Sequence, residues 1–157
     1  TLHRILNDLP VVVPGDGTSL WVMTHHKDFA KGLVGVLDND LAFNETFHIT
    51  SDEFLTWNRI YELMGSAVGK KVKMVHVPSN VIARYDKEMG DSLLGDKSHS
   101  MIFDNDKIKR AVGGFDCKIP FEEGAKEIAN WYLNNKKFQI INEENNGVFE
   151  ALIEKYG

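Results

Sequence analysis

The strand-forming segments of this chain are few and short, and this limits what the chain can fold into. Runs rich in β-branched or aromatic residues occur at 11–13, 20–24, 47–50 and 72–77. Between and after them, apolar residues recur at helical spacing and predict about six or seven helices. Strands this short and few do not make a well-covered parallel sheet alone. We therefore expect a helix-rich α/β chain whose sheet is incomplete.

The helix predicted at 28–39 supports the same interpretation. Apolar residues cover more than half of its surface, so we expect it to be buried against something large. Neither this helix nor the strand predicted at 47–50 has an evident partner sheet within the chain. The first residues, from Thr1 to Leu9, already show helical spacing, as if a helix were entered partway. These features favour a fragment of a longer protein over a trimmed domain.

Charge and cysteine content restrict the partners. Lys and Arg number 18 against 23 Asp and Glu, and the net charge of −5 opposes binding to nucleic acid. The sequence contains no apolar run of about 18 residues, the length that predicts a membrane span. Cys117 is the only cysteine, which excludes an internal disulfide and a cysteine-based zinc site. We expect a cytoplasmic protein with no nucleic-acid or membrane partner.

Two short motifs resemble cofactor-binding or catalytic motifs but lack the surrounding residues that such motifs require. Gly15-Asp16-Gly17 begins like a dinucleotide loop, yet Leu20 stands where the third glycine is needed and an extended run follows. Tyr132 and Lys136 match Y-x-x-x-K, but Tyr132 lies on the apolar face of its predicted helix. We therefore predict no catalytic and no cofactor-binding residue in this chain.

Several ionisable side chains lie in predicted loops. His25 and His26 precede the helix predicted from Asp28, where they can cap it or face a cleft. Since neighbouring side chains of an extended segment point to opposite sides, we expect no shared metal ion there. Lys97 and His99 lie in a polar run for which a binding loop and a solvated turn are both open interpretations.

A series of motifs gives the chain a family resemblance. In order they are Pro14-Gly15-Asp16-Gly17, Asp28-Phe29-Ala30, Phe47-His48-Ile49-Thr50, Gly95-Asp96, Asp104-Asn105-Asp106-Lys107, Ile119-Pro120-Phe121-Glu122-Glu123-Gly124 and Trp131-Tyr132. Their order and spacing resemble the C-terminal half of the extended short-chain dehydrogenase/reductase family, the NAD-dependent epimerase/dehydratases. The resemblance runs from Leu9 to Leu133.

This resemblance implies the C-terminal part of an extended Rossmann-type fold whose N-terminal nucleotide-binding half is absent. Residues 1–141 would be the substrate-binding portion, in which helix 28–39 and strand 47–50 are orphaned Rossmann elements. Residues 142–157 would be a polar hinge and a terminal amphipathic helix. The NAD or NADP site and the catalytic Y-x-x-x-K would lie upstream, so the fragment would be inactive alone.

Two departures from the family pattern bear on the substrate. Sugar-nucleotide members place arginines where this chain has Trp21 and Leu93, and such arginines bind diphosphates. Their absence implies a small hydroxylated or sugar-like substrate instead of a nucleoside-diphosphate sugar. Trp21 would stack on this substrate. Hydrogen bonds to it would come from His25, His26, Lys97 and His99.

Two other functions stay open. A non-catalytic binding or sensor protein on the same scaffold is the first alternative, with RNA binding disfavoured by the net charge of −5. A self-contained interaction domain is the second. A homodimer is a further expectation for this chain, whichever function applies.

Overall fold

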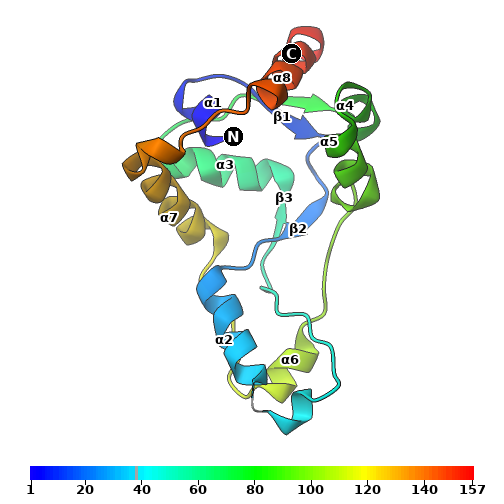
Figure 1. The fold of residues 1–157 in the computed structure, drawn as a ribbon, viewed down its shortest axis with the longest axis vertical. Coiled ribbons are helices and arrows are strands. Elements are labelled where there is room, and N and C mark those ends of the chain that lie inside the picture. Colours follow the sequence, from blue (N-terminus) through cyan, green and yellow to red (C-terminus); the bar gives the residue numbers. More distant parts are fainter. Residues whose placement is uncertain (38) are drawn as a thin grey trace.

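The computed structural model describes residues 1–37 and 39–157 (Figure 1). A helix-rich body contains both termini, and an arm projects from it with helices α2 and α6. The strands are β1 (Val11–Pro14), β2 (Leu20–Val22), β3 (Phe54–Thr56) and β4 (Met74–Val77). The α-helices are α1 (Leu2–Leu6), α2 (His26–Val36), α3 (Trp57–Ala67), α4 (Ser79–Tyr85), α5 (Lys87–Ser92), α6 (Asp106–Ala111), α7 (Phe121–Asn134) and α8 (Glu143–Tyr156). Three shorter helical turns are η1 (Asp40–Ala42), η2 (Leu93–Lys97) and η3 (Lys136–Phe138).

Strands β1 and β4 form a parallel pair at the centre of the body, with Val11 opposite Met74 and Pro14 opposite Val77. Because side chains alternate along a strand, β1 buries two different faces. Val11 and Val13 pack against α1 and α3, whereas Val12 packs with α4, η2 and α8. The pair is therefore covered on both faces, as parallel strands require.

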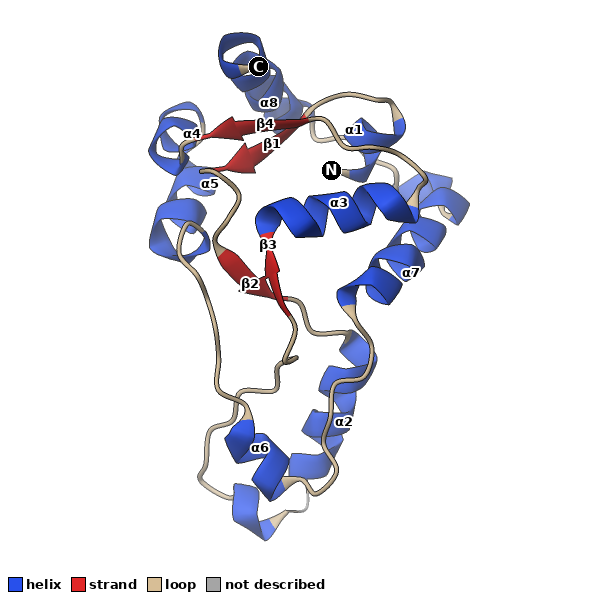
Figure 2. Cartoon of the chain, turned by 180° about the vertical axis from the view of Figure 1, so that it is seen from behind, coloured by secondary structure: helices blue, strands red, loops and turns tan. Residues whose placement is uncertain are grey.

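Strands β2 and β3 form an antiparallel pair that leads directly into α3 (Figure 2). Thr56 ends β3 and caps the helix, because its hydroxyl accepts a 3.1 Å hydrogen bond from the Arg59 N–H. The inner face of α3 then packs against α7 through Ile60, Leu63 and Ala125. This packing holds α7 beside the end of β2.

Polar contacts link the elements of the arm around the buried apolar side chains of Ile108 and Phe115. Asn39 donates a 2.8 Å hydrogen bond to the Ala111 carbonyl, and Asn105 donates one of the same length to the Thr50 carbonyl. Asp28, whose side chain is fully buried, accepts a hydrogen bond from the Ile119 N–H at 2.8 Å. These bonds hold α2, α6 and the segment before α7 together.

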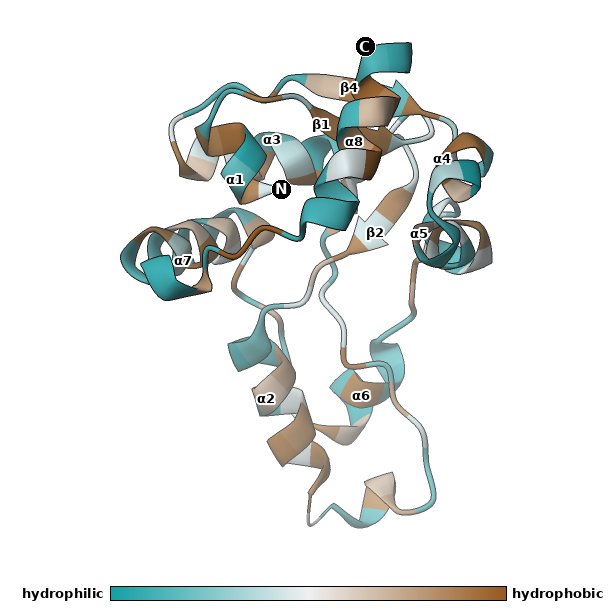
Figure 3. Ribbon diagram, turned by 45° about the horizontal axis from the view of Figure 1, so that its top comes forward, coloured by the Kyte–Doolittle hydropathy of each residue, from teal (hydrophilic) through white to brown (hydrophobic). Residues whose placement is uncertain are grey.

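The helix predicted at 28–39 forms as His26–Val36, and position 38 lies outside the described residues. Within this chain the helix is not buried against a large partner, so its burial against a sheet outside the chain stays a prediction. Leu33 and Val34 are 44% and 66% exposed, and apolar positions recur along α2 in Figure 3. Asp28 and Gly32 are the buried residues of α2. The other sides of the helix stay exposed because few residues of the arm pack against them.

The strand predicted at 47–50 does not form. Without a neighbouring strand to bond, the extended segment lies against α2 instead. A Cβ added to Gly32 would come within 2.5 Å of the Ile49 side chain. Both predicted Rossmann elements thus lie in the arm, away from the parallel pair β1–β4 (Figure 2).

The polar hinge predicted at the start of 142–157 is also wrong. Asn142 caps α8 by accepting a 2.9 Å hydrogen bond from the Asn145 N–H, and the helix continues to Tyr156. Leu152 is fully buried against the β1–β4 pair. The segment is therefore part of the body. Among the described residues, no helix is both long and apolar enough to cross a membrane.

Candidate functional site

Two pockets contain predicted site residues. The polar pocket has a volume of about 380 Å³ and is lined by Pro14, Gly15, Asp16, Thr18, Ser19, Ser79, Ser98, His99 and Ser100. The apolar pocket has a volume of about 530 Å³ and is lined by Val22, Met23, Thr24, His25, His26, Phe121, Gly124, Glu127, Ile128 and Trp131. The two pockets share no lining residue.

The polar pocket lies where the parallel strands end. Strand β1 ends at Pro14, and β4 ends one residue before Pro78 and two before Ser79. In open α/β sheets, ligands bind outside the carboxyl ends of the strands. The turn after β1 depends on glycine at Gly15 and Gly17, where φ is 63° and 72°. The position of the pocket therefore agrees with a ligand site.

Asp16 is an ionised acceptor at the edge of the polar pocket. Its Oδ1 accepts hydrogen bonds from the Thr18 hydroxyl at 2.6 Å and from the Thr18 N–H at 2.9 Å. These bonds hold the pKa of Asp16 below its usual value. The carboxylate is thus charged at neutral pH and can accept a hydrogen bond from a ligand hydroxyl.

Hydrogen bonds to β2 hold the loop 98–101 in place. The Leu20 N–H donates to the Ser100 hydroxyl at 3.0 Å, and the Met101 N–H donates to the Leu20 carbonyl at 2.9 Å. This brings His99 from a distant part of the sequence to the end of β1. The pocket consequently combines an imidazole, a carboxylate and several hydroxyls.

Trp21 and Lys97 lie side by side but line neither pocket. The Lys97 Nζ is 5.8 Å from the centroid of the Trp21 ring and donates a 2.7 Å hydrogen bond to Ser92 Oγ. Trp57 occupies one face of Trp21, at 5.4 Å between ring centroids. Trp21 is therefore a half-buried wall residue with at most one face free for stacking.

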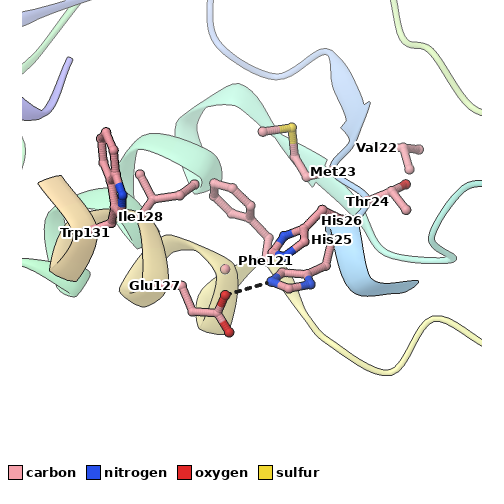
Figure 4. A pocket seen from close by; sticks show the side chains of 10 residues that line it. Val22, Met23, Thr24, His25, His26, Phe121, Glu127, Ile128 and Trp131 are labelled. Carbon is pink, nitrogen blue, oxygen red and sulfur yellow. Dashed lines mark hydrogen bonds and ion pairs between the residues drawn. The ribbon is translucent and has the colours of Figure 1, made fainter. Parts of the chain in front are cut away.

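His25 and His26 line the apolar pocket together with α7 (Figure 4). Their rings lie 4.3 Å apart. The premise that they must point apart is wrong, because the backbone is extended only at His25, the N-cap, and turns helical at His26. His25 Nε2 lies 3.1 Å from Glu127 Oε2, and Lys27 Nζ lies 3.0 Å from Glu127 Oε1. The bonds from Lys27 and His25 lower the pKa of Glu127.

The five predicted site residues therefore fall into three places: His99 in the polar pocket, Trp21 with Lys97 beside each other, and the two histidines in the apolar pocket. Leu93, where the family resemblance implies an arginine, is only 8% exposed and belongs to the core. Sequence reasoning missed the hydroxyl and carboxylate groups of the polar pocket. One sequence feature could have indicated them: Asp16, Thr18, Ser19 and Ser79 come just after two predicted strands that each end at a proline.

No family model matches this chain. Among characterised proteins, 2′-dehydrokanamycin reductase from Streptomyces kanamyceticus is 33% identical over 70 residues, which is 45% of this chain and 20% of that protein. Probable GDP-L-fucose synthase 1 from Oryza sativa is 27% identical over 82% of this chain and 34% of its own length. A chloroplast stem-loop binding protein of 41 kDa from Arabidopsis thaliana is 30% identical over 43% of this chain and 18% of its own. The matched region thus spans about a third or less of each relative.

Solved structures match most of the chain. The epimerase Mth375 of Methanothermobacter thermautotrophicus superposes with a TM-score of 0.69 at 17% identity, over 87% of this chain and 36% of its own. UDP-glucose 4-epimerase from Thermotoga maritima gives 0.65 at 22% identity, over 85% and 38%. UDP-glucuronic acid 4-epimerase from Bacillus cereus, solved in complex with NAD, gives 0.64 at 17% identity, over 87% and 37%.

The fold is therefore that of one part of a Rossmann-type α/β enzyme, the helix-rich C-terminal part. More particularly, it is the fold of NAD-dependent epimerases and dehydratases, and the resemblance to the extended short-chain dehydrogenase/reductases is confirmed.

Proposed function

We propose that this chain is the substrate-binding part of a cytoplasmic NAD(P)-dependent epimerase/dehydratase-like oxidoreductase. The observation that carries the proposal is the polar pocket at the carboxyl ends of β1 and β4. In a parallel α/β sheet this edge is where a substrate and a nucleotide cofactor meet. The neighbouring strands and the cofactor site would belong to a nucleotide-binding half outside this chain.

We further propose a small hydroxylated or sugar-like substrate, not a nucleoside-diphosphate sugar. The polar pocket offers serine and threonine hydroxyls, the Asp16 carboxylate and the His99 imidazole, which all hydrogen-bond to hydroxyl groups. None of the residues lining it is Lys or Arg, the usual partners of a diphosphate. Trp21 and Lys97 would form the adjoining wall.

The glycine turn after β1 does not fit the pyrophosphate of NAD. A pyrophosphate binds at a helix N-terminus that directly follows a glycine-rich turn. Here the turn at Gly15–Gly17 leads into the extended strand β2. We therefore propose that this chain orients the substrate hydroxyls and excludes water, while hydride transfer and proton transfer depend on groups outside it. Alone, the chain would be inactive.

The coding sequence upstream of Thr1 gives the first test. We expect it to encode a glycine-rich strand–helix loop followed by Y-x-x-x-K. A coding sequence that lacks both would overturn the proposed oxidoreductase.

In the full-length protein, we expect His99→Ala or Trp21→Ala to raise KM for the hydroxylated substrate about tenfold, which corresponds to losing about 1.4 kcal/mol of binding. His48→Ala is the matched control, because His48 is exposed in the arm, where its ring lies beside Phe103. Steady-state kinetics measures both effects. An unchanged KM in both site variants would remove these residues from the substrate site.

A non-catalytic binding protein on the same scaffold is the second candidate, favoured by the match to the stem-loop binding protein. The net charge of −5 opposes RNA binding, although Lys70, Lys71 and Lys73 gather near one end of α3. We expect no gel shift with a stem-loop RNA at low salt. A shift that disappears at high salt and in a Lys70→Ala/Lys71→Ala/Lys73→Ala variant would favour this candidate instead.

A further inference from the structure

Three metal-binding side chains meet at the rim of the apolar pocket (Figure 4). His25 and His26 come from the start of α2, and Glu127 comes from the middle of α7. One ligand atom from each residue lies within 4.8 Å of the other two. Among the described residues, no other group of three His, Cys, Asp or Glu side chains brings its ligand atoms within this distance.

Helix packing positions these side chains. Gly124 lies one turn before Glu127 on α7, and a Cβ added there would be 3.4 Å from Cδ2 of His25. The His25 ring therefore lies against this turn of α7, with room for a contact of ordinary van der Waals length. The His25 side chain is only 7% exposed, whereas that of Glu127 is 48% exposed. One ligand is therefore fixed by packing, and the exposed His26 and Glu127 side chains are free to adjust around it.

We propose that His25, His26 and Glu127 form a binding site for a divalent transition-metal ion of the zinc type. Two imidazoles and a carboxylate suit zinc, which binds such groups at about 2.0–2.2 Å. Around a tetrahedral ion at that distance, ligand atoms are roughly 3.3 Å apart, so the two exposed side chains need to close in. Mg²⁺ prefers oxygen ligands and is not expected to bind.

Two interactions of the metal-free chain compete with the ion. Lys27 Nζ pairs with Glu127 Oε1 at 3.0 Å, and this ammonium would move away when the carboxylate binds a cation. The Lys27 N–H donates to His25 Nδ1 at 3.3 Å, a long hydrogen bond. Binding of the metal at His25 Nε2 would place the ring proton on Nδ1 and end this contact. Removing the Lys27 ammonium should therefore tighten metal binding.

Three protein ligands leave a coordination position open, as in catalytic zinc sites. The metal-binding residues and the apolar side chains of Met23, Phe121 and Ile128 line the same pocket. The class of molecule that fits has an apolar body and one oxygen or nitrogen that binds the metal. Since the apolar and polar pockets share no lining residue, this proposal does not depend on the proposed oxidoreductase function.

The experiment is a calorimetric titration of the metal-free chain with ZnCl₂, and with MgCl₂ as the comparison ion. We expect one Zn²⁺ per chain and no Mg²⁺ binding. His26→Ala and Glu127→Gln should each weaken the Zn²⁺ affinity by at least about tenfold, and Lys27→Met should strengthen it. His48→Ala is the matched control and should bind as the unaltered chain does. Thermal unfolding without metal verifies that each variant is folded.

Co²⁺ in place of Zn²⁺ adds a direct spectroscopic readout. Visible absorption typical of a four- or five-coordinate ion is expected for the unaltered chain and for His48→Ala, and it should be lost in His26→Ala. No Zn²⁺ binding, or Zn²⁺ binding that His26→Ala and Glu127→Gln leave unchanged, would overturn the proposal.

Discussion

Asp28 is the residue that most directly joins the arm to the start of α7. Its carboxylate is fully buried and accepts hydrogen bonds from the Ile119 N–H at 2.8 Å and the Lys31 ammonium at 2.7 Å. Burial raises the pKa of Asp28, but the bonds from Lys31 and Ile119 outweigh it, and the pKa is lowered. The charged form is therefore the one that the fold stabilises.

Replacing Asp28 by alanine should destabilise the fold. We expect Asp28→Ala to lower the free energy of unfolding by about 2 kcal/mol, because it leaves the Ile119 N–H without its acceptor. Urea unfolding measures this. Asp91→Ala is the control, since the Asp91 side chain is 68% exposed on α5 and its loss should change stability little.

The hydrogen-bonded Asp28 carboxylate also predicts how the stability of the fold depends on pH. Because the pKa of Asp28 is lower in the folded state than its ordinary value of 3.8, its contribution is fully present above that value. It is lost as the pH falls further, through the folded pKa. The stability difference between the unaltered chain and Asp28→Ala should therefore shrink in acid. A difference that stays constant down to acidic pH would contradict this role for the carboxylate.

At the scale of elements, the close approach of α4 and α5 depends on Gly90. A Cβ at Gly90 would lie 2.5 Å from the Cβ of Ala83 and 2.6 Å from its Cα, and the latter atom cannot move without the helix. We expect Gly90→Ala to push the two helices apart and to lower stability by about 1–3 kcal/mol. Thermal or urea unfolding measures the loss.

Gly95 is the matched control in the neighbouring η2 turn. A Cβ there would meet nothing within 4 Å, so Gly95→Ala should be nearly neutral. Helix α5 and the η2 turn lead directly into the loop at 98–100, which lines the polar pocket. Gly90→Ala should therefore also weaken the binding of a ligand to that pocket. Equal stability of the two variants would show that α4 and α5 can separate at little cost.

At the scale of the whole molecule, the arm leaves large apolar side chains in contact with water. Val34, Leu41 and Phe43 are 66%, 70% and 79% exposed. We expect the native chain to bind the dye 8-anilinonaphthalene-1-sulfonate, as exposed apolar surface does. The fluorescence should fall in the combined variant Val34→Ser/Leu41→Ser/Phe43→Ser, with little change in the unfolding midpoint. Absence of dye binding by the folded chain would mean that the arm buries this surface in solution.

The sequence by itself determined the elements that depend on local signals. Three local signals correspond to observed boundaries: the β-branched run at 11–13, the proline that closes 72–77, and Pro120 before the amphipathic helix α7. The order of the motifs also indicated the fold, because each motif can be recognised from its own residues and their spacing along the chain. That resemblance is confirmed by the superposition on epimerases and dehydratases.

Only the tertiary structure decided what depends on partners far along the chain. Residues 47–50 have strand-like composition, but a strand needs a neighbour to bond, and Ile49 packs on α2 instead. The His25–His26–Glu127 group and the polar pocket combine residues that are about 80 to 100 positions apart. Local patterns can mark single members of these groups, but they do not predict that the members meet. Distances between such side chains are set by how helices and strands pack, and packing is a property of the folded chain.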